Sequence, residues 1–296
     1  MMNLTKLKYF HAICTFHSFS EAAEYLHISQ PSLSNAIKEL ENEYGVSLFS
    51  RHYRGVSLTS EGQVLYNLSK DVLNRTEQAE NIMKELGTGR KKLRLGVPPM
   101  IGSMILPRIY GDFLSLNKDL ELEIVEGGRQ DLVYKLSKDY LDMVFLSHDV
   151  PVDSGFSSLL VSQLEITCCT FKDNYITSCD SITPTMLKDI PLVLFENSFF
   201  QTAKIKSWFE SAQVTPNIIL QTTQLSTMLS MISSNLAVGF MFRELIDTNP
   251  ALLPIPTAEP MYANVSLVWK KDAFFSNSMN KFKQYVKQTN LFNSNM

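Results

Sequence analysis

The sequence lacks any apolar run long enough to cross a membrane. Its longest apolar stretches, residues 192–195 and 236–242, fall far short of the ~20 residues that a bilayer-spanning helix needs. The N-terminus also lacks the basic start, apolar segment and small-residue cleavage site of a signal peptide. We therefore expect a cytoplasmic protein with no membrane partner.

Cysteine is scarce, and catalytic motifs are missing. The four cysteines, Cys14, Cys168, Cys169 and Cys179, form no C-x-x-C pair and no cluster with histidine at zinc spacing, so we expect neither a disulfide framework nor a metal. The sequence contains no G-x-S-x-G, H-E-x-x-H or dinucleotide-binding motif. These absences predict a protein that needs no cofactor and is not an enzyme.

The chain also has little excess charge. Its formal net charge is −3, and its first 58 residues carry five lysines and arginines against five glutamates. Bulk charge therefore does not indicate nucleic-acid binding, and such a function must rest on where the cations lie. At 296 residues, with 45% hydrophobic and 19% charged residues, the chain is long enough for at least two folded units.

Three short helices are predicted at the N-terminus. Apolar residues between Leu4 and Cys14 recur at steps of three and four, which is typical of a helix with one buried side. Ser18 or Ser20 can cap a second helix, and Ser29 can cap a third. Short helices in such close succession favour an all-α segment.

The third helix separates apolar from polar residues. Leu33, Ile37 and Leu40 share one side, while Asn35 and Lys38 point the other way. On that second side a lysine can bind phosphate, and an asparagine can donate and accept at a base edge. A merely solvated helix face would show the same pattern, so that alternative stays open.

A β-hairpin is predicted after this helix. Gly45 ends the helix, and residues 47–59 alternate around a turn that carries Arg51 and Arg54. A hairpin beside such a helix can lie along the DNA backbone or in the minor groove, where arginines add salt-dependent affinity. The pattern predicts a winged helix-turn-helix that binds double-stranded promoter DNA.

The run SFSEAAEYLHISQPSLSNAIKELENEYGVSLFSRHYRGVSLTSEG, residues 18–62, resembles the DNA-binding domain of LysR-type transcription regulators almost position by position. Many members of that family carry an arginine where this chain has Asn35. The resemblance implies contacts to the DNA backbone from Ser20, Arg51 and Arg54. It also implies a groove-facing set that consists of Gln30, Pro31, Ser32, Ser34, Asn35 and Lys38.

A long helix with an apolar stripe is predicted next. Residues 60–86 contain no proline, and apolar residues follow a three-four repeat that Arg75 interrupts. A helix packed on its own domain is the alternative, but the spacing favours pairing with a second copy, and the resemblance implies a homodimer that assembles to a tetramer. The stripe comprises Leu65, Leu68, Val72, Ala79, Ile82 and Leu86.

Strand-like and helical segments alternate in two rounds beyond Lys92, which predicts two α/β lobes. The predicted fold is therefore α/β: a winged helix-turn-helix (residues 1–59), a linker helix and hinge (60–90), and an effector-binding domain (91–296). The resemblance implies that this last domain is periplasmic-binding-protein-like. Its lobe I would comprise residues 91–161 and 266–296, and its lobe II residues 162–265.

A small-molecule effector is expected between these lobes. The string LGVPPMIGSMILP places a strand end before a helix N-terminus, where a small anion can dock, although an ordinary turn would look alike. The string also resembles that of family members that regulate carbon metabolism, which implies a short organic acid. The expected contacts are Pro99, Met100, Ile101, Ser103, Gly128 and Arg129, with Phe200, Thr202 and Phe240 implied from the second lobe.

Two other functions stay open at this point. Some LysR-type regulators sense oxidants through paired cysteines, and Cys168, Cys169 and Cys179 are candidates here, although Cys168 and Cys169 lie in an apparent strand where buried thiols are usual. The other alternative is a cytosolic α/β protein or enzyme that binds a small molecule but not DNA. Salt-dependent DNA retention discriminates between a regulator and such a protein.

Overall fold

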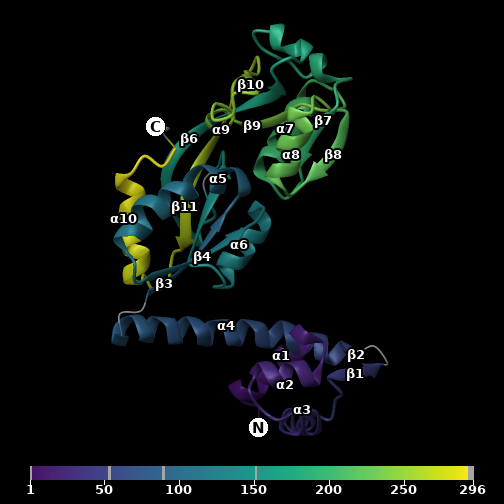
Figure 1. The fold of residues 1–296 in the computed structure, drawn as a ribbon, viewed down its shortest axis with the longest axis vertical. Coiled ribbons are helices and arrows are strands. Elements are labelled where there is room, and N and C mark those ends of the chain that lie inside the picture. The colour runs from purple at the N-terminus through teal and green to yellow at the C-terminus, as the bar shows by residue number, and fades with distance from the viewer. Residues whose placement is uncertain (1, 53–54, 89–90, 151, 293–296) are drawn as a thin grey trace. The chain divides into compact units, whose positions relative to one another are not determined.

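A computed structural model of the chain describes residues 2–52, 55–88, 91–150 and 152–292. The chain divides into two compact units, Met1–Met83 and Lys84–Met296 (Figure 1). Within the described ranges, no helix is both long and apolar enough to span a bilayer.

The N-terminal unit consists of three short helices, a β-hairpin and most of a long helix. In chain order these are α1 (Leu4–Phe16), α2 (Phe19–Tyr25), α3 (Gln30–Tyr44), β1 (Phe49–His52), β2 (Gly55–Leu58) and α4 (Ser60–Thr88). β1 and β2 pair antiparallel. The winged helix-turn-helix and the long helix predicted from the sequence are therefore present.

Side-chain caps fix where the short helices begin. The Ser18 hydroxyl accepts a hydrogen bond from the Glu21 N–H, and the Ser29 hydroxyl accepts one from the Ser32 N–H. Ser18 is thus the cap of α2. At the other end of α3, Gly45 takes a left-handed conformation with φ +68°, which a glycine adopts without steric cost.

The core of this unit lies where the three short helices meet. Phe10 and Ile13 of α1 pack with Leu33 and Leu40 of α3, and each is fully buried. Ala22 of α2 is fully buried as well, and its small side chain lets the helices approach closely. Burial of this side of α3 leaves its polar side to the solvent.

The N-terminal part of α4 packs against α1. Leu65 and Tyr66 cover the core of the short helices, and the His11 ring stacks on Tyr66 with ring centroids 4.7 Å apart. The Ser69 hydroxyl donates to the Leu65 carbonyl at 2.6 Å, so His11 Nε2 donates to Ser69 Oγ at 2.8 Å. Leu65, predicted on the apolar stripe of α4, therefore packs partly within its own unit.

The C-terminal unit is built on a seven-stranded mixed sheet. β3 pairs parallel with β4 and β5, whereas β11 pairs antiparallel with β5 and β6, and β6 pairs antiparallel with β9 and β10. The strands are β3 (Lys91–Val97), β4 (Leu120–Glu126), β5 (Met143–His148), β6 (Phe156–Phe171), β9 (Gly239–Phe242), β10 (Leu252–Ile255) and β11 (Met261–Lys270). A separate parallel pair consists of β7 (Leu192–Phe195) and β8 (Ile218–Thr222).

Helices cover these strands. They are α5 (Pro99–Arg108), a π-helix (Ile109–Leu114), α6 (Arg129–Ser137), α7 (Phe200–Ser211), α8 (Leu225–Ser233), α9 (Arg243–Ile246) and α10 (Asn277–Gln288), with short 3-10 turns at Tyr175–Ser178 and Thr185–Leu187. The helix predicted within the string LGVPPMIGSMILP begins at Pro99. Pro107 lies inside α5, and the π-helix follows directly because proline supplies no N–H to the α-helical ladder.

The two lobes share the long strands β6 and β11, which run from the β3–β5 region towards β9 and β10 (Figure 1). Their register shifts between Val265 and Ser266, opposite Val161. A shift of this kind lets a paired ribbon bend. The boundary between the lobes was predicted at residues 161/162 and 265/266, which is where the register shifts. The position of the boundary remains a prediction.

Candidate nucleic-acid interface and ligand cleft

The exposed side of α3 carries the residues predicted to enter the groove. Gln30, Pro31, Ser32, Asn35 and Lys38 are exposed, and Ser34 is half-buried. The Ser32 hydroxyl lies 2.7 Å from Ser29 Oγ, so it also takes part in the cap. The polar residues of the predicted set therefore share one accessible helix face.

The acidic residues of α3 are engaged elsewhere. The Glu39 carboxylate pairs with Lys6 of α1 at 2.9 Å, and the Glu41 carboxylate accepts from the Leu48 N–H at 2.7 Å. Lys38, by contrast, has no ion pair among the described residues. The accessible face of α3 thus presents a cation whose neighbouring carboxylates are already bound, which the net charge of the segment did not reveal.

The remaining predicted contacts to the DNA backbone lie on α2 and the hairpin. Ser20 is exposed within α2, and its hydroxyl is not needed for the cap because Ser18 supplies it. Arg51 lies on β1 opposite Val56. Arg54 lies outside the described residues.

In the C-terminal unit Gly128 of the first lobe lies close against Ser198 of the second. A Cβ atom placed on this glycine would lie 2.6 Å from Ser198 Oγ, so a larger residue would push α6 away from the segment before α7. One cavity lies on each side of this contact. We call them the α5 cavity, about 830 Å³, and the α7 cavity, about 680 Å³.

The predicted effector contacts divide between these two cavities. Pro99, Ser103 and Gly128 line the α5 cavity, with Glu126 and Asp131 also on its wall. Arg129 and Phe200 line the α7 cavity. The sequence had grouped these residues around one ligand, whereas the Gly128 contact separates them.

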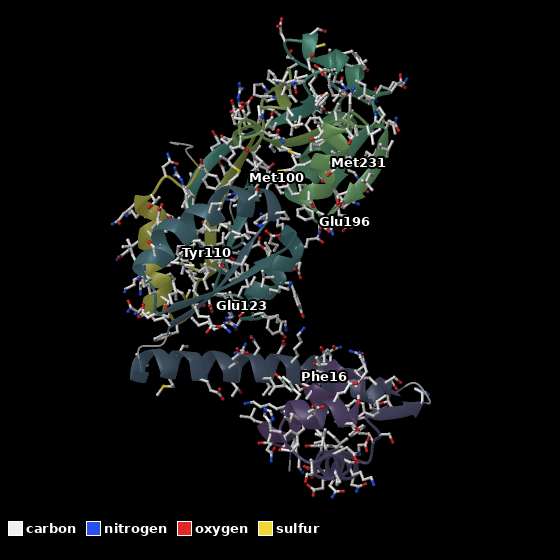
Figure 2. The ribbon with its side chains drawn as sticks, in the orientation of Figure 1. Phe16, Met100, Tyr110, Glu123, Glu196 and Met231 are labelled. Carbon is white, nitrogen blue, oxygen red and sulfur yellow. The ribbon has the colours of Figure 1, made fainter. Side chains whose placement is uncertain are left out.

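Four other predicted contacts point into the protein interior. Met100, labelled near the start of α5 in Figure 2, is buried in the hydrophobic core with Ile101 and Phe240. The Thr202 hydroxyl is buried and donates to the Phe195 carbonyl at 2.8 Å. Because α5 begins at Pro99, its first turn directs these apolar side chains to the core.

The α7 cavity contains residues that the sequence reasoning missed. Lys204 and Trp208 follow Phe200 at steps of four on α7, so all three share a helix face. Lys204 Nζ lies 3.4 Å from an Asp149 carboxylate oxygen and 5.7 Å from the centroid of the Phe200 ring. The four-residue spacing was a signal that could have found them.

The end of β5 lies beside the α7 cavity, on the side of the first lobe. Arg129 donates from its guanidinium to the Ser147 carbonyl at 3.0 Å, and the Ser147 hydroxyl is buried without a hydrogen-bond partner in the described part of the chain. His148 Nδ1 donates to the Val150 carbonyl, and its Nε2 accepts from the Ser266 hydroxyl, both at 2.8 Å. Burial lowers the pKa of His148, which favours the neutral ring.

Two of the three candidate redox cysteines, Cys168 and Cys169, do not have the properties of a redox sensor, whereas Cys179 is half-buried. Cys168 and Cys169 are fully buried in β6. Burial raises the pKa of the Cys169 thiol to about 12, and it raises the pKa of Cys168 well above its usual range. Because the thiolate is the reactive form, buried thiols of this kind are inert. Among the described residues, no His, Cys, Asp and Glu side chains form a metal-binding group.

A winged helix-turn-helix with an accessible polar helix, followed by two lobes around a ligand cleft, defines the class of effector-responsive transcription regulators. Residues 4–63 match the family of bacterial regulatory helix-turn-helix proteins of the lysR family. Residues 87–290 match the LysR substrate binding domain. The chain belongs to the LysR family of transcriptional regulators.

Relatives and solved structures resemble the chain along nearly its whole length. The uncharacterized HTH-type transcriptional regulator YwbI of Bacillus subtilis is 28% identical over 97% of this chain and 96% of its own. The HTH-type transcriptional regulator CzcR of the same organism is 23% identical over 98% and 99%. The crystal structure of full-length CbnR complexed with its target DNA has a TM-score of 0.74 at 18% identity, covering 97% of this chain and 99% of CbnR. That likeness shows a shared fold.

Proposed function

We propose that this regulator binds promoter DNA as a homodimer, which assembles further to a tetramer, and that a small carboxylate held between its two lobes modulates this binding. The observation that carries the DNA-binding part is the accessible face of α3. It presents Asn35 and Lys38 while the nearby carboxylate of Glu39 is paired with Lys6. A helix of this kind fits the major groove, where side chains reach base edges and phosphates.

The individual contacts follow from the chemistry of each side chain. Asn35 and Gln30 can form paired hydrogen bonds with an adenine edge, and Ser34 allows close approach of the helix. Lys38, Ser20, Arg51 and Arg54 bind phosphates and set the position of the helix. Base preference is therefore assigned to Asn35, and general affinity to Lys38.

The dimer is supported by the exposed apolar residues of α4. Leu68 is 66% exposed, Val72 46% and Leu86 69%, and they recur at the spacing of a pairing helix. Leu65 is engaged with the short helices, so the proposed contact begins at Leu68. Since the N-terminal domain has little net charge, two copies on one DNA site would supply the affinity that one copy lacks.

The charges of the two cavities favour the α7 cavity for a carboxylate. The charged residues on the wall of the α5 cavity are Glu126 and Asp131, which repel an anion. The α7 cavity contains Lys204 and Arg129, and within the described residues the Arg129 guanidinium bonds a carbonyl and no carboxylate. Guanidinium N–H groups that bind a carboxylate form short, charge-assisted hydrogen bonds.

Three measurements on the full-length protein test this function. Retention of a palindromic promoter fragment should fall steeply as salt is raised, as counterion release requires. A thermal-shift screen of organic acids at constant ionic strength should raise the melting temperature with at least one acid. Gel filtration of Leu68→Glu tests the dimer, with Gln63→Glu as the control, because Gln63 is exposed on the opposite side of the same helix. DNA binding that does not weaken as salt is raised contradicts the DNA-binding function. A Leu68→Glu dimer as stable as the wild type contradicts the proposed dimer contact.

A further inference from the structure

We propose that the α7 cavity selects a carboxylate that carries an aromatic ring, and that this ligand displaces Asp149 from Lys204. The inference rests on the proposed function, because it assumes a carboxylate effector between the lobes. It adds the class of ligand and the ion pair that the ligand breaks. Both additions come from the side chains on the wall of the α7 cavity.

The aromatic part follows from the size and lining of the cavity. At about 680 Å³, the cavity falls in the range that holds a ring-bearing ligand and is far larger than a two-carbon acid needs. Phe200 contributes a half-buried ring and Pro260 an exposed apolar side chain to its wall, and Phe199, Trp208 and Met261 line it with mostly buried side chains. A ligand ring packs against Phe200 and Pro260, whereas a short aliphatic acid leaves them in water.

The carboxylate part follows from the two cations. Arg129 approaches from the N-terminus of α6 in the first lobe, and Lys204 approaches from α7 in the second. The other charged residues on the wall are Asp149 and Glu259, and Asp149 already pairs with Lys204 at 3.4 Å. A ligand carboxylate between Arg129 and Lys204 therefore competes with Asp149 for the same ammonium group.

This competition links binding to lobe position. Asp149 follows β5 in the first lobe, so its ion pair with Lys204 joins the two lobes directly. The Asp149 side chain is 50% exposed and that of Lys204 is 24% exposed, and an ion pair of such accessibility is weak enough for a ligand to replace. When the ligand carboxylate takes over Lys204, the direct ion pair between the lobes breaks and the ligand bridges them instead.

Three probes separate the parts of this proposal: phenylacetate, phenylacetamide and acetate. Phenylacetamide keeps the ring without the charge, and acetate keeps the charge without the ring. The chain contains two tryptophans. Trp269 packs against Phe275 on β11 and is absent from the cavity wall, so the emission of full-length Trp269→Phe reports Trp208.

We expect phenylacetate to change Trp208 emission saturably, with acetate and phenylacetamide binding about tenfold or more weakly at constant ionic strength. Lys204→Met should weaken phenylacetate binding. Asp149→Asn should tighten it several-fold, because the competitor is removed. Lys135→Met is the matched control, since Lys135 pairs with Asp131 at 2.7 Å outside this cavity. Circular dichroism melts would confirm that each variant is folded.

Different results overturn different claims. Equal affinity for acetate and phenylacetate refutes the aromatic selectivity but leaves a carboxylate effector standing. Equal affinity for phenylacetamide and phenylacetate refutes the carboxylate contact. Unchanged or weaker binding by a folded Asp149→Asn variant refutes the displacement. If no acid binds while the protein still retains DNA, both the inference and the carboxylate effector fail, and the DNA-binding function remains.

Discussion

Replacing Lys38 with alanine tests whether the accessible face of α3 binds DNA. Lys38 is exposed and makes no ion pair among the described residues, so its removal should not disturb the fold. Each lysine that neutralises a phosphate contributes about 0.9 to the slope of log affinity against log salt, and a dimer presents two, so the slope should fall by about 1.8. The ratio of wild-type affinity to variant affinity should then fall about twelvefold between about 50 and 200 mM salt.

Fluorescence anisotropy of a labelled promoter fragment over a salt series measures this slope directly. Lys8→Ala is the control, because Lys8 lies on α1 in a loose pair with Glu80 at 3.9 Å and is not among the predicted contacts. It removes the same charge from the same unit. If Lys38→Ala and Lys8→Ala change the slope equally, Lys38 does not bind a phosphate, and the assignment of this face to DNA is wrong.

Three further predictions concern the caps, ion pairs and histidines. Ser29→Ala should lower the free energy of unfolding of the N-terminal unit by about 1 kcal/mol, measured by urea titration with circular dichroism, since α3 loses its cap; no change would exclude that role. Arg94→Met should cost the C-terminal unit about 3 kcal/mol by tryptophan fluorescence, because it removes the guanidinium that contacts the Asp142 carboxylate at 2.7 Å. Adding Asp142→Asn, which removes the unpaired charge but keeps an acceptor for the backbone N–H of residue 94, should restore most of the stability. The pKa of His148 in the folded protein is lowered from 6.5, so between the two pKa values the unfolded chain binds more protons than the folded one. The free energy of unfolding therefore falls as pH is lowered through that interval. Between about pH 7.5 and 5.5, the His148→Asn variant should lose less stability than the wild type.

The sequence was sufficient for elements whose periodicity is strong. The polar side of α3 was found because Leu33 and Ile37 mark its buried side unambiguously. The first half of β6 was missed, because serines at positions 157, 158 and 162 and the exposed Leu160 give no clear alternation. That half is a strand because it pairs with β11, and such pairing between distant segments leaves no mark within either one.

The ligand cleft was only partly predictable for a related reason. Arg129 and Phe200 reach the α7 cavity, and Pro99 and Ser103 reach the α5 cavity. Whether these residues share one ligand depends on how closely the lobes approach at Gly128, which is a tertiary property. Local reasoning indicated which strand ends could contribute, but not that Ser198 would lie between the two groups.

The register shift at Val265 and Ser266 has a mechanical consequence. Because β6 and β11 pass through both lobes as one hydrogen-bonded ribbon, a change in the angle between the lobes must bend this ribbon. The lobes do not rotate about a free linker. Ser266 at the shift is hydrogen-bonded to His148, the residue next to Asp149. Release of the Asp149 carboxylate from Lys204 would thus act next to the residue that contacts this shift, where a small displacement corresponds to a large change in lobe angle.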